Sequence, residues 1–440
     1  MPLLRDIFYG FAAAITSPIW GYHLLRTGKW RTDWAGRFGK VPAGAMNGRG
    51  EAGSGKGPTI MIHAVSVGEI NATRLLVKQL DEAFAGKCRI VITATTNTGI
   101  ARANELYEGR HIVLRYPLDL TRSVRRFLDA VKPDLVALME LELWPTFVQE
   151  CDRRKIPIGV INGRLSERSF KGYRFFRAVI RSAFRRLTFA AVQTKEYAER
   201  FIGLGTDPAR VQVADSMKWD TANVADAASV SGANELAAAM GIDPARPLIV
   251  CGSTGPGEEE LLVAARPAGV QMMIVPRKPE RFNEVAATMQ RLAPDQKLVR
   301  RTEHADGSTR AIDGSELFLL DTMGELRKAY ALADVVIVGR SFIDLYGSDP
   351  MEPAAIGKPV IIGPHHGDFK DAIDTLKAAE GIIISDQPCE AASGLLADRD
   401  AAARLASNGQ KSILSRQGAT ARHVKLIVDQ LNRNAAKTHA

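Results

Sequence analysis

The chain has 440 residues, of which 46% are hydrophobic and 24% are charged. This composition excludes a largely disordered chain and a protein made of many membrane spans. The formal net charge of +9 favours anionic partners such as phosphates, acidic lipids or nucleic acid. Four widely spaced cysteines without a CxxC pair are typical of buried residues in a reducing compartment. No His spacing suits a metal ion, so we expect no metal and no cofactor.

The most apolar part of the chain is residues 3–25. From Ile7 to Leu25 there is no charged residue, although Pro18 and polar residues interrupt the run, which barely reaches the length of a membrane span. Basic residues and tryptophans follow up to residue 40, a pattern typical of an anchor at the cytoplasmic face. We expect residues 1–42 to associate with the inner (cytoplasmic) membrane from its cytoplasmic side. The alternative is an amphipathic helix packed on the body.

A Gly-rich stretch, residues 43–58, has the composition of a flexible linker. After it, short apolar runs alternate with helical patterns, which predicts α/β domains with parallel sheets. We assign residues 59–225 to a first domain and residues 226–415 to a second, with a hinge in the Ala-rich segment 222–245. Residues 416–440 form a predicted C-terminal helix, with the option of crossing back to the first domain.

In the first domain, polar residues gather where predicted strands end and helices begin. Glu69 lies at such a point beside Ser66 and Gly68. Thr96 and Thr98 place hydroxyls at the next helix start, which suits either an anion or simple helix capping. The remaining candidates end two later strands: Glu140, Glu142, Asn162 and Arg164.

Residues 164–186 form a basic segment with eight Lys or Arg, one Glu and five interleaved aromatic residues. A charged run is usually a solvated helix face. Cations mixed with aromatics at helical spacing suit an interfacial helix or a phosphorylated lipid acceptor. The same mixture would suit nucleic acid.

The second domain is organised around residues 321–368. A buried strand at 335–338 is followed by a Gly-rich loop and by Glu352, which opens a helix. A carboxylate just past a parallel strand lies where open α/β sheets bind ligands, and it could accept hydrogen bonds from a ribose diol. The alternative is an exposed Glu favoured by the helix dipole. Ser253 and Thr254 lie where a helix N-terminus would hold a phosphate, and Arg277 ends the following strand.

Two doubly wound domains, a hinge and a ribose-type Glu describe the GT-B glycosyltransferase architecture, with a cleft between its domains. The sequence also resembles the Kdo (3-deoxy-D-manno-octulosonic acid) transferases of lipid A assembly over nearly its whole length. The matching phrases occur in the same order: HAVSVGE (63–69), TTNTG (95–99), ELELWP (140–145), NGRLSERS (162–169), GSTGPGEEE (252–260), PRKPERF (276–282), DTMGEL (321–326) and MEPAAIGKPVIIGP (351–364).

The resemblance implies inverting, metal-independent transfer of Kdo from CMP-Kdo to a phosphorylated lipid A precursor of the lipid IVA type. It places this step of lipopolysaccharide synthesis at an anionic membrane surface, with no nucleic acid partner. It also implies that Glu69 is the catalytic base and that Glu142 orients the acceptor or tunes Glu69. Nucleotide binding is expected from Ser253, Thr254, Pro276, Arg277, Met323, Gly324, Glu325, Asp349 and Glu352. Acceptor binding is expected from Ser66, Gly68, Thr96, Thr98, Asn162 and Arg164.

The chain departs from the family pattern at several positions. Asp349 stands where relatives have Asn, and Lys278 replaces the His of the PRH phrase. These departures leave two alternatives open. One is a GT-B transferase with another nucleotide sugar or acceptor, and the other is a non-catalytic protein that binds anionic lipids or nucleic acid.

Overall fold

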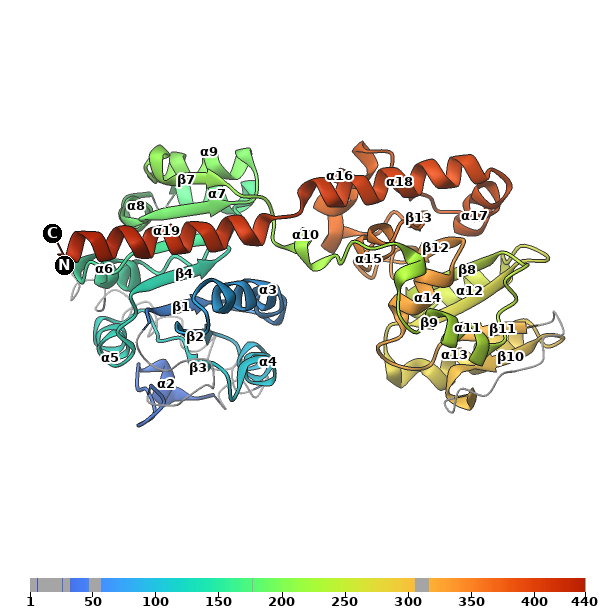
Figure 1. Cartoon of the computed structure of the whole chain (residues 1–440), viewed down its shortest axis with the longest axis horizontal. Coiled ribbons are helices and arrows are strands. Elements are labelled where there is room, and N and C mark those ends of the chain that lie inside the picture. The colour runs from blue at the N-terminus through green and yellow to red at the C-terminus, as the bar shows by residue number, and fades with distance from the viewer. Residues whose placement is uncertain are drawn as a thin grey trace. The chain divides into compact units, whose positions relative to one another are not determined.

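The computed structural model describes residues 6, 26, 32–46, 57–175, 177–304 and 316–439. Most of the predicted membrane segment (1–42) and of the Gly-rich linker (43–58) therefore lies outside the described residues. The chain forms two compact units, Met1–Thr221 with Gly418–Ala440, and Ala222–Gln417. Each unit is described by itself, and Figure 1 labels their elements.

Unit 1 is built on a seven-stranded sheet in which every neighbouring pair of strands is parallel. Its strands are β1 (Thr59–His63), β2 (Arg89–Ala94), β3 (Ile112–Arg115), β4 (Leu135–Met139), β5 (Ile158–Gly163), β6 (Phe189–Val192) and β7 (Val211–Val213). The strand order is β3-β2-β1-β4-β5-β6-β7. The order reverses between β1 and β4, and such a switch point is where doubly wound sheets bind ligands. The predicted α/β class with parallel sheets is confirmed.

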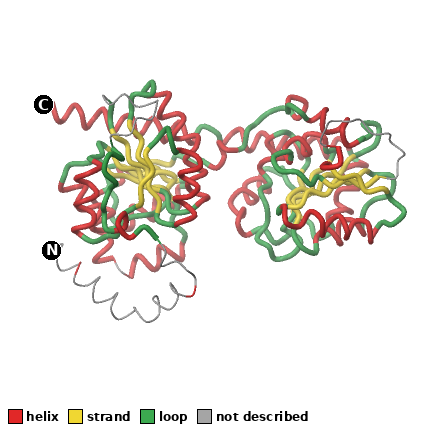
Figure 2. The backbone as a smooth tube through the Cα atoms, turned by 90° about the horizontal axis from the view of Figure 1, so that it is seen from below, coloured by secondary structure: helices red, strands yellow, loops and turns green. Residues whose placement is uncertain are grey.

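The helices of unit 1 follow its strands in sequence. They are α2 (Trp34–Arg37), α3 (Val67–Ala83), α4 (Asn97–Tyr107), α5 (Thr121–Val131), α6 (Pro145–Arg153), α7 (Glu167–Phe175), α8 (Arg177–Arg186), α9 (Lys195–Leu204), the short η1 (Pro208–Arg210), α10 (Lys218–Thr221) and α19 (Ala419–His439). Figure 2 shows helices on both sides of the strands.

The core of unit 1 occupies both faces of the sheet, because alternate residues of a strand point to opposite faces. Ile60 and Ile62 belong to a cluster with Leu76 on α3 and Ile427 on α19. Met61, which lies between them on β1, belongs instead to a cluster with residues of α5 and α6. Strands buried on both faces read as continuous apolar runs, as in this sequence.

The C-terminal helix α19 is part of unit 1 and packs against α3, β4 and α10 (Figure 1). Buried hydrogen bonds of His423 hold this helix in place. The N–H of Asn162, at the end of β5, donates to Nε2 of His423 at 2.9 Å, and Nδ1 of His423 lies 2.7 Å from the Ala419 oxygen. Burial lowers the pKa of His423, so the neutral ring that accepts from Asn162 is favoured.

Unit 2 is a second seven-stranded parallel sheet. Its strands are β8 (Leu248–Thr254), β9 (Gln271–Pro276), β10 (Lys297–Arg300), β11 (Glu316–Leu319), β12 (Val335–Val338), β13 (Val360–Ile362) and β14 (Ile383–Ile384). The order is β10-β11-β9-β8-β12-β13-β14, so the switch point lies between β8 and β12.

The helices of unit 2 again cover its sheet. They are η2 (Ala227–Ser229), α11 (Ala233–Met240), α12 (Glu258–Ala264), η3 (Pro279–Arg281), α13 (Phe282–Leu292), η4 (Arg301–His304), α14 (Leu326–Leu332), α15 (Met351–Ala355), η5 (Gly367–Phe369), α16 (Lys370–Ala378), α17 (Pro388–Ala397) and α18 (Arg399–Arg416). The Ala-rich segment expected to act as a hinge contains η2 and α11 and belongs to unit 2. The chain passes between the units at Thr221–Ala222 and at Gln417–Gly418.

Among the described residues, no helix combines the length and the apolar character needed to cross a membrane. The apolar run from Ile7 to Leu25 lies outside them.

His63, at the end of β1, is a fully buried titratable group. Its ring stacks on Tyr116 at 3.8 Å between centroids, and Nδ1 lies 3.2 Å from the Thr93 oxygen, while Nε2 is buried without a partner. Burial lowers the pKa of His63 to about 3. The unfolded chain takes up a proton near pH 6.5, and the folded chain does not.

We expect the free energy of unfolding to fall as the pH decreases from about 6.5 towards 3, because the unfolded state then binds more protons. Between pH 6.5 and 5, His63 should account for about 2 kcal/mol of this loss. Urea unfolding at both pH values measures the change. In His63→Phe, which keeps a ring against Tyr116, the loss should be smaller by that amount. An unchanged pH dependence in the variant would show that His63 is not its source.

Candidate functional site

Glu69 lies in the first turn of α3, next to the carboxyl end of β1. Ser66 caps this helix, and its hydroxyl accepts from the Glu69 N–H at 3.4 Å. The Glu69 carboxylate accepts in return from the Val65 N–H and from the Ser66 hydroxyl, each at 2.9 Å. This reciprocal arrangement is a variant of the capping box in which the carboxylate binds the N–H of the residue before the N-cap, so Glu69 has a structural role whether or not it also acts in catalysis. Its side chain is partly exposed, beside the exposed Gly68.

Glu140 and Glu142 follow β4, the neighbour of β1 at the switch point. Glu140 has a positive φ of 56°, a conformation that non-glycine residues adopt rarely and that often marks functional sites. Oε2 of Glu142 accepts from the indole N–H of Trp144 at 3.0 Å. Both glutamates are partly buried.

Burial and neighbouring carboxylates raise the pKa values of Glu140 and Glu142. Burial raises the pKa of Glu140, and the charge of Glu69 raises it further, whereas Lys218 and Arg164 oppose the change. Burial also raises the pKa of Glu142; the Trp144 hydrogen bond opposes this, and the charges of Glu69 and Glu140 add to it. Carboxylates with raised pKa values at a strand-end switch point are typical of acid–base chemistry. Glu140 was predicted to end the strand but was not assigned a role, and the structure adds it to this group.

Thr96 and Thr98 lie at the start of α4, as predicted. Thr96 caps the helix, with its Oγ1 accepting from the Gly99 N–H at 3.0 Å. The same hydroxyl donates to the Val65 oxygen at 2.8 Å, which joins this loop to the one that carries Glu69. Thr98 is exposed. Thr96 therefore caps the helix, as one of the two expectations required. Thr98, in the first turn of the helix, is still accessible to solvent.

Arg164 and Asn162, both predicted to bind the acceptor, have different surroundings. Arg164 is exposed, and its charge reaches Glu140. Asn162 is 1% exposed and has a positive φ of 52°. Its Oδ1 accepts from the Met217 N–H at 3.0 Å, and its backbone bonds to His423. Asn162 thus links β5 to α19 through its hydrogen bond to His423. Its side chain is buried and not accessible to solvent.

In unit 2, Ser253 and Thr254 end β8, but no helix begins directly after them. Both are buried, and the Thr254 hydroxyl donates to Glu259 at 2.8 Å. Helix α12 starts four residues later, at Glu258. The predicted order of strand, turn and helix is present, with Gly257 at a positive φ of 86° before the helix. Phosphate binding by Ser253 and Thr254 stays a prediction.

Glu258 already occupies the backbone N–H groups at this switch point. Its carboxylate is fully buried and accepts from four N–H groups: those of Gly255 at 2.8 Å, Arg340 at 2.5 Å, Ser341 at 2.8 Å and Phe342 at 2.9 Å. An internal carboxylate therefore occupies N–H groups at this switch point, among them that of Gly255, the residue after Thr254. It also locks the loop after β8 to the loop after β12.

Arg277 follows Pro276 at the end of β9 and is exposed. Its backbone N–H donates to the Thr254 oxygen at 3.0 Å, which places it beside the end of β8. The neighbouring Arg281 is bound instead to buried Glu259 by two hydrogen bonds of 2.8 and 3.1 Å. Of these two arginines, Arg277 is the one open to a ligand.

Glu352 lies in the first turn of α15, as predicted, and is partly buried. Burial raises its pKa, and the charge of Asp349 raises it further, while Arg327 opposes the change. Oδ1 of Asp349 accepts from the Met351 N–H at 2.8 Å. These two carboxylates thus lie together at the helix start that follows β12.

The three residues predicted in the DTMGEL phrase are not equivalent. Met323 is 64% exposed, and Gly324 is exposed with a positive φ of 85°. Glu325 instead binds Arg301 and Lys328, each at 3.1 Å. Burial would raise the pKa of Glu325, but hydrogen bonds from Thr322, Lys328 and Arg301 outweigh it and lower the pKa. Met323 and Gly324 are open to a ligand, whereas Glu325 holds its own loop.

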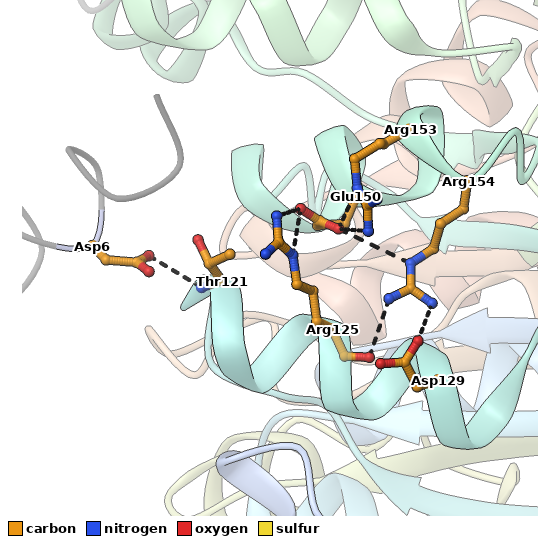
Figure 3. Close-up of polar contacts among 7 residues, drawn as sticks. All are labelled: Asp6, Thr121, Arg125, Asp129, Glu150, Arg153 and Arg154. Atoms are coloured by element: carbon orange, nitrogen blue, oxygen red, sulfur yellow. Dashed lines mark hydrogen bonds and ion pairs between the residues drawn. The ribbon is translucent and has the colours of Figure 1, made fainter.

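Helices α5, α6 and α8 form an arginine-rich face of unit 1. Helix α6 packs against both α5 and α8. Together they carry eight arginines and three acidic residues. Figure 3 shows buried Glu150 at its centre, within ion-pair distance of Arg125, Arg153 and Arg154. The predicted basic segment supplies α8 to this face, and its Phe184 is a core residue rather than a surface aromatic. Sequence reasoning missed the contribution of α5 and α6.

Replacing Glu258 by Ala should strongly destabilise unit 2, because four buried N–H groups would lose their acceptor. We expect a loss of on the order of 4 kcal/mol in unfolding free energy, measured by chemical denaturation. Glu260→Ala removes an exposed carboxylate from the same helix and serves as the control, with little expected effect. Equal stability of the two variants would contradict the role given to Glu258.

Known proteins resemble this chain in sequence. A family model described as 3-deoxy-D-manno-octulosonic-acid transferase (kdotransferase) matches residues 32–221. The 3-deoxy-D-manno-octulosonic acid transferase of Haemophilus influenzae is 30% identical over 385 residues, which cover 85% of this chain and 88% of that protein. The transferase of the same name from Bordetella pertussis is 31% identical, with 86% of each chain covered.

Solved structures resemble the chain in fold. The crystal structure of Acinetobacter baumannii MurG matches with a TM-score of 0.53 at 15% identity, covering 85% of this chain and 100% of that one. A UDP-GlcNAc 2-epimerase from Neisseria meningitidis matches with a TM-score of 0.54 at 13% identity, again over 85% and 100%. At such identities the likeness shows the fold alone. The relatives at 30 and 31% identity carry the assignment: the chain belongs to the family of 3-deoxy-D-manno-octulosonic acid transferases, and it is a glycosyltransferase.

Proposed function

We propose that this chain transfers Kdo from CMP-Kdo to a phosphorylated lipid A precursor of the lipid IVA type, with inversion at the anomeric carbon. The observation that carries the proposal is the position of Glu69, at the β1/β4 switch point beside Glu140 and Glu142. The names of the relatives supply the sugar.

Glu69 is the proposed general base. An inverting transfer forms a bond from the acceptor oxygen to the anomeric carbon while the bond to the CMP phosphate breaks, and the hydroxyl proton must be removed. A partly exposed carboxylate held in place by two hydrogen bonds is suited to receive that proton. The charge of Glu69 acts on Glu140 and Glu142, whose pKa values are raised by burial and by neighbouring carboxylates.

The donor is assigned to unit 2. Exposed Arg277 is the cation we expect to contact the phosphate of CMP-Kdo, since charged donors stabilise a leaving phosphate. Glu352 is expected to accept from the ribose hydroxyls, as acids at this position do in nucleotide folds. Met323 and Gly324 are expected near the nucleotide. We expect no metal requirement, and this stays a prediction.

We also propose that the enzyme works at the cytoplasmic face of the inner membrane. Two described anchor points support it. Asp6, just before the apolar run, accepts from the Thr121 N–H at the start of α5 at 3.1 Å (Figure 3). After that run, the backbone oxygen of Arg37 accepts from the Leu118 N–H at 2.7 Å, two residues before the N-cap of α5. Asp6 and Arg37, described residues on either side of the apolar run, thus bind backbone at or just before the start of α5, a helix of the arginine-rich face whose charge favours anionic lipid.

Glu69→Gln should lower kcat by at least about a hundredfold, because a carboxamide cannot serve as the base. Gln also fits the N3 position of a capping box, so the fold should be kept. Mass spectrometry after incubation with CMP-Kdo and a tetraacylated, phosphorylated lipid A precursor measures turnover, with and without EDTA. The control Glu82→Gln alters an exposed carboxylate of the same helix and should be neutral. Full activity of Glu69→Gln would reject the assigned base, and no Kdo adduct with the unaltered enzyme would reject the proposed acceptor or donor.

Arg122→Gln combined with Arg126→Gln should weaken binding to phosphatidylglycerol vesicles roughly thirtyfold, at about 1 kcal/mol for each basic residue near the surface. Both residues are exposed on α5. The matched control is Arg74→Gln with Lys78→Gln on α3, which covers the opposite face of the same sheet. Vesicle sedimentation measures binding, with phosphatidylcholine vesicles as the uncharged reference. Equal losses in both double variants would mean that net charge, and not this face, directs the enzyme to the membrane.

A further inference from the structure

Two arginines from different elements meet at the start of α4. Nη2 of Arg37, on α2, and Nη1 of Arg115, at the end of β3, donate to the same backbone oxygen, that of Thr95, at 3.0 and 2.8 Å. Nη2 of Arg115 also donates to Oδ1 of Asn97, the first residue of α4, at 2.8 Å. Two positive side chains therefore lie against the N-terminus of one helix, where the helix dipole adds partial positive charge.

Among the described residues, the positive charge of this pair is only partly offset. One nearby carboxylate, that of Asp33, acts on both arginines, and its Oδ1 accepts from the Gly36 N–H at 2.9 Å. Burial lowers the pKa of both guanidinium groups, and the charge of Arg37 lowers that of Arg115 further. Arg115 is only 8% exposed, and its Nε is buried without a hydrogen-bond partner. Two partly desolvated cations held this close are stabilised by an added anion.

The arginine pair is connected to Glu69 through one short loop. Thr96 follows Thr95, and its hydroxyl donates to the Val65 oxygen at 2.8 Å. The Val65 N–H donates in turn to Oε2 of Glu69 at 2.9 Å. This close approach requires Gly99, since a Cβ at that position would lie 2.8 Å from the Val65 oxygen. An acceptor whose hydroxyl meets Glu69 would therefore extend past the first turn of α4.

We propose that Arg37, Arg115 and the first turn of α4 bind a phosphate monoester of the acceptor, while its hydroxyl lies at Glu69. The inference rests on the proposed function. Forked guanidinium donors match the oxygens of a phosphate, and the N-terminus of an eleven-residue helix stabilises the same charge. A phospholipid headgroup offers the same chemistry, so the experiment must separate the two sources.

Binding of the full-length protein to a water-soluble probe tests the site without turnover. The probe is a deacylated glucosamine disaccharide carrying two phosphates, compared with the same disaccharide without phosphate, in calorimetric titrations. Arg37→Gln should weaken binding of the phosphorylated probe roughly tenfold, as expected for a lost charge-assisted contact, and leave the unphosphorylated probe unaffected. Arg115→Lys keeps the charge but loses the forked donor geometry. Its affinity for the phosphorylated probe should lie between that of the unaltered protein and that of Arg37→Gln. Arg110→Gln, just beyond the other end of α4, is the matched control and should be neutral.

Circular dichroism and thermal unfolding of each variant show whether the fold is kept. Equal weakening of both probes by Arg37→Gln, or no weakening of either, would overturn the phosphate site. Loss of binding to phosphatidylglycerol vesicles with intact binding of the phosphorylated probe would assign the pair to the bilayer and also overturn it. Because these titrations need no donor, intact phosphate-dependent binding without Kdo transfer would reject the proposed function alone.

Discussion

The parallel pairing of β1 with β4 is the constraint on which the grouping of carboxylates in unit 1 depends. His63 lies opposite Leu138 in this pairing, so the carboxyl ends of the two strands lie at the same edge of the sheet. The loop after β1 then delivers Glu69 on the first turn of α3, and the loop after β4 delivers Glu140 and Glu142. Since these carboxylates come from segments some seventy residues apart, only the strand pairing brings their charges together. The raised pKa values of Glu140 and Glu142 follow from that proximity as well as from burial.

Carboxylates at the two switch points have opposite roles. In unit 2, Glu258 is fully buried and accepts from four backbone N–H groups, and Glu259 binds both Arg281 and Thr254. Such fully satisfied buried acids hold loops in place, because removing either partner would leave buried polar groups unpaired. In unit 1, Glu140 and Glu142 are only partly buried and face other carboxylates. An acid that is poorly compensated is poised to exchange a proton, whereas a fully compensated acid is not.

The sequence was sufficient to predict elements whose signals are local. The apolar runs of β1, β4, β8 and β12 predicted parallel strands, and the SVGE and MEP phrases placed Glu69 and Glu352 in first turns of helices. Features that depend on distant partners could not be predicted in this way. The burial of Asn162 depends on His423, 261 residues away. Three of the four N–H groups bound by Glu258 lie more than eighty residues beyond it, on the loop after β12. Arg37 and Arg115 belong to no shared motif, and they meet only because α2 packs beside the end of β3.

Asp349, where the chain departs from its family's Asn, shows how a departure can preserve shape and change electrostatics. Its Oδ1 accepts from the Met351 N–H, a bond that the amide oxygen of Asn would accept equally well. The start of α15 therefore does not require the carboxylate. What the carboxylate adds is negative charge, which raises the pKa of Glu352 beyond the effect of burial. That charge strengthens acceptance from ribose hydroxyls but repels a phosphate. If the proposed donor binds here, cations must offset this charge, and Arg327 of unit 2, whose charge lowers the pKa of Glu352, offsets part of it.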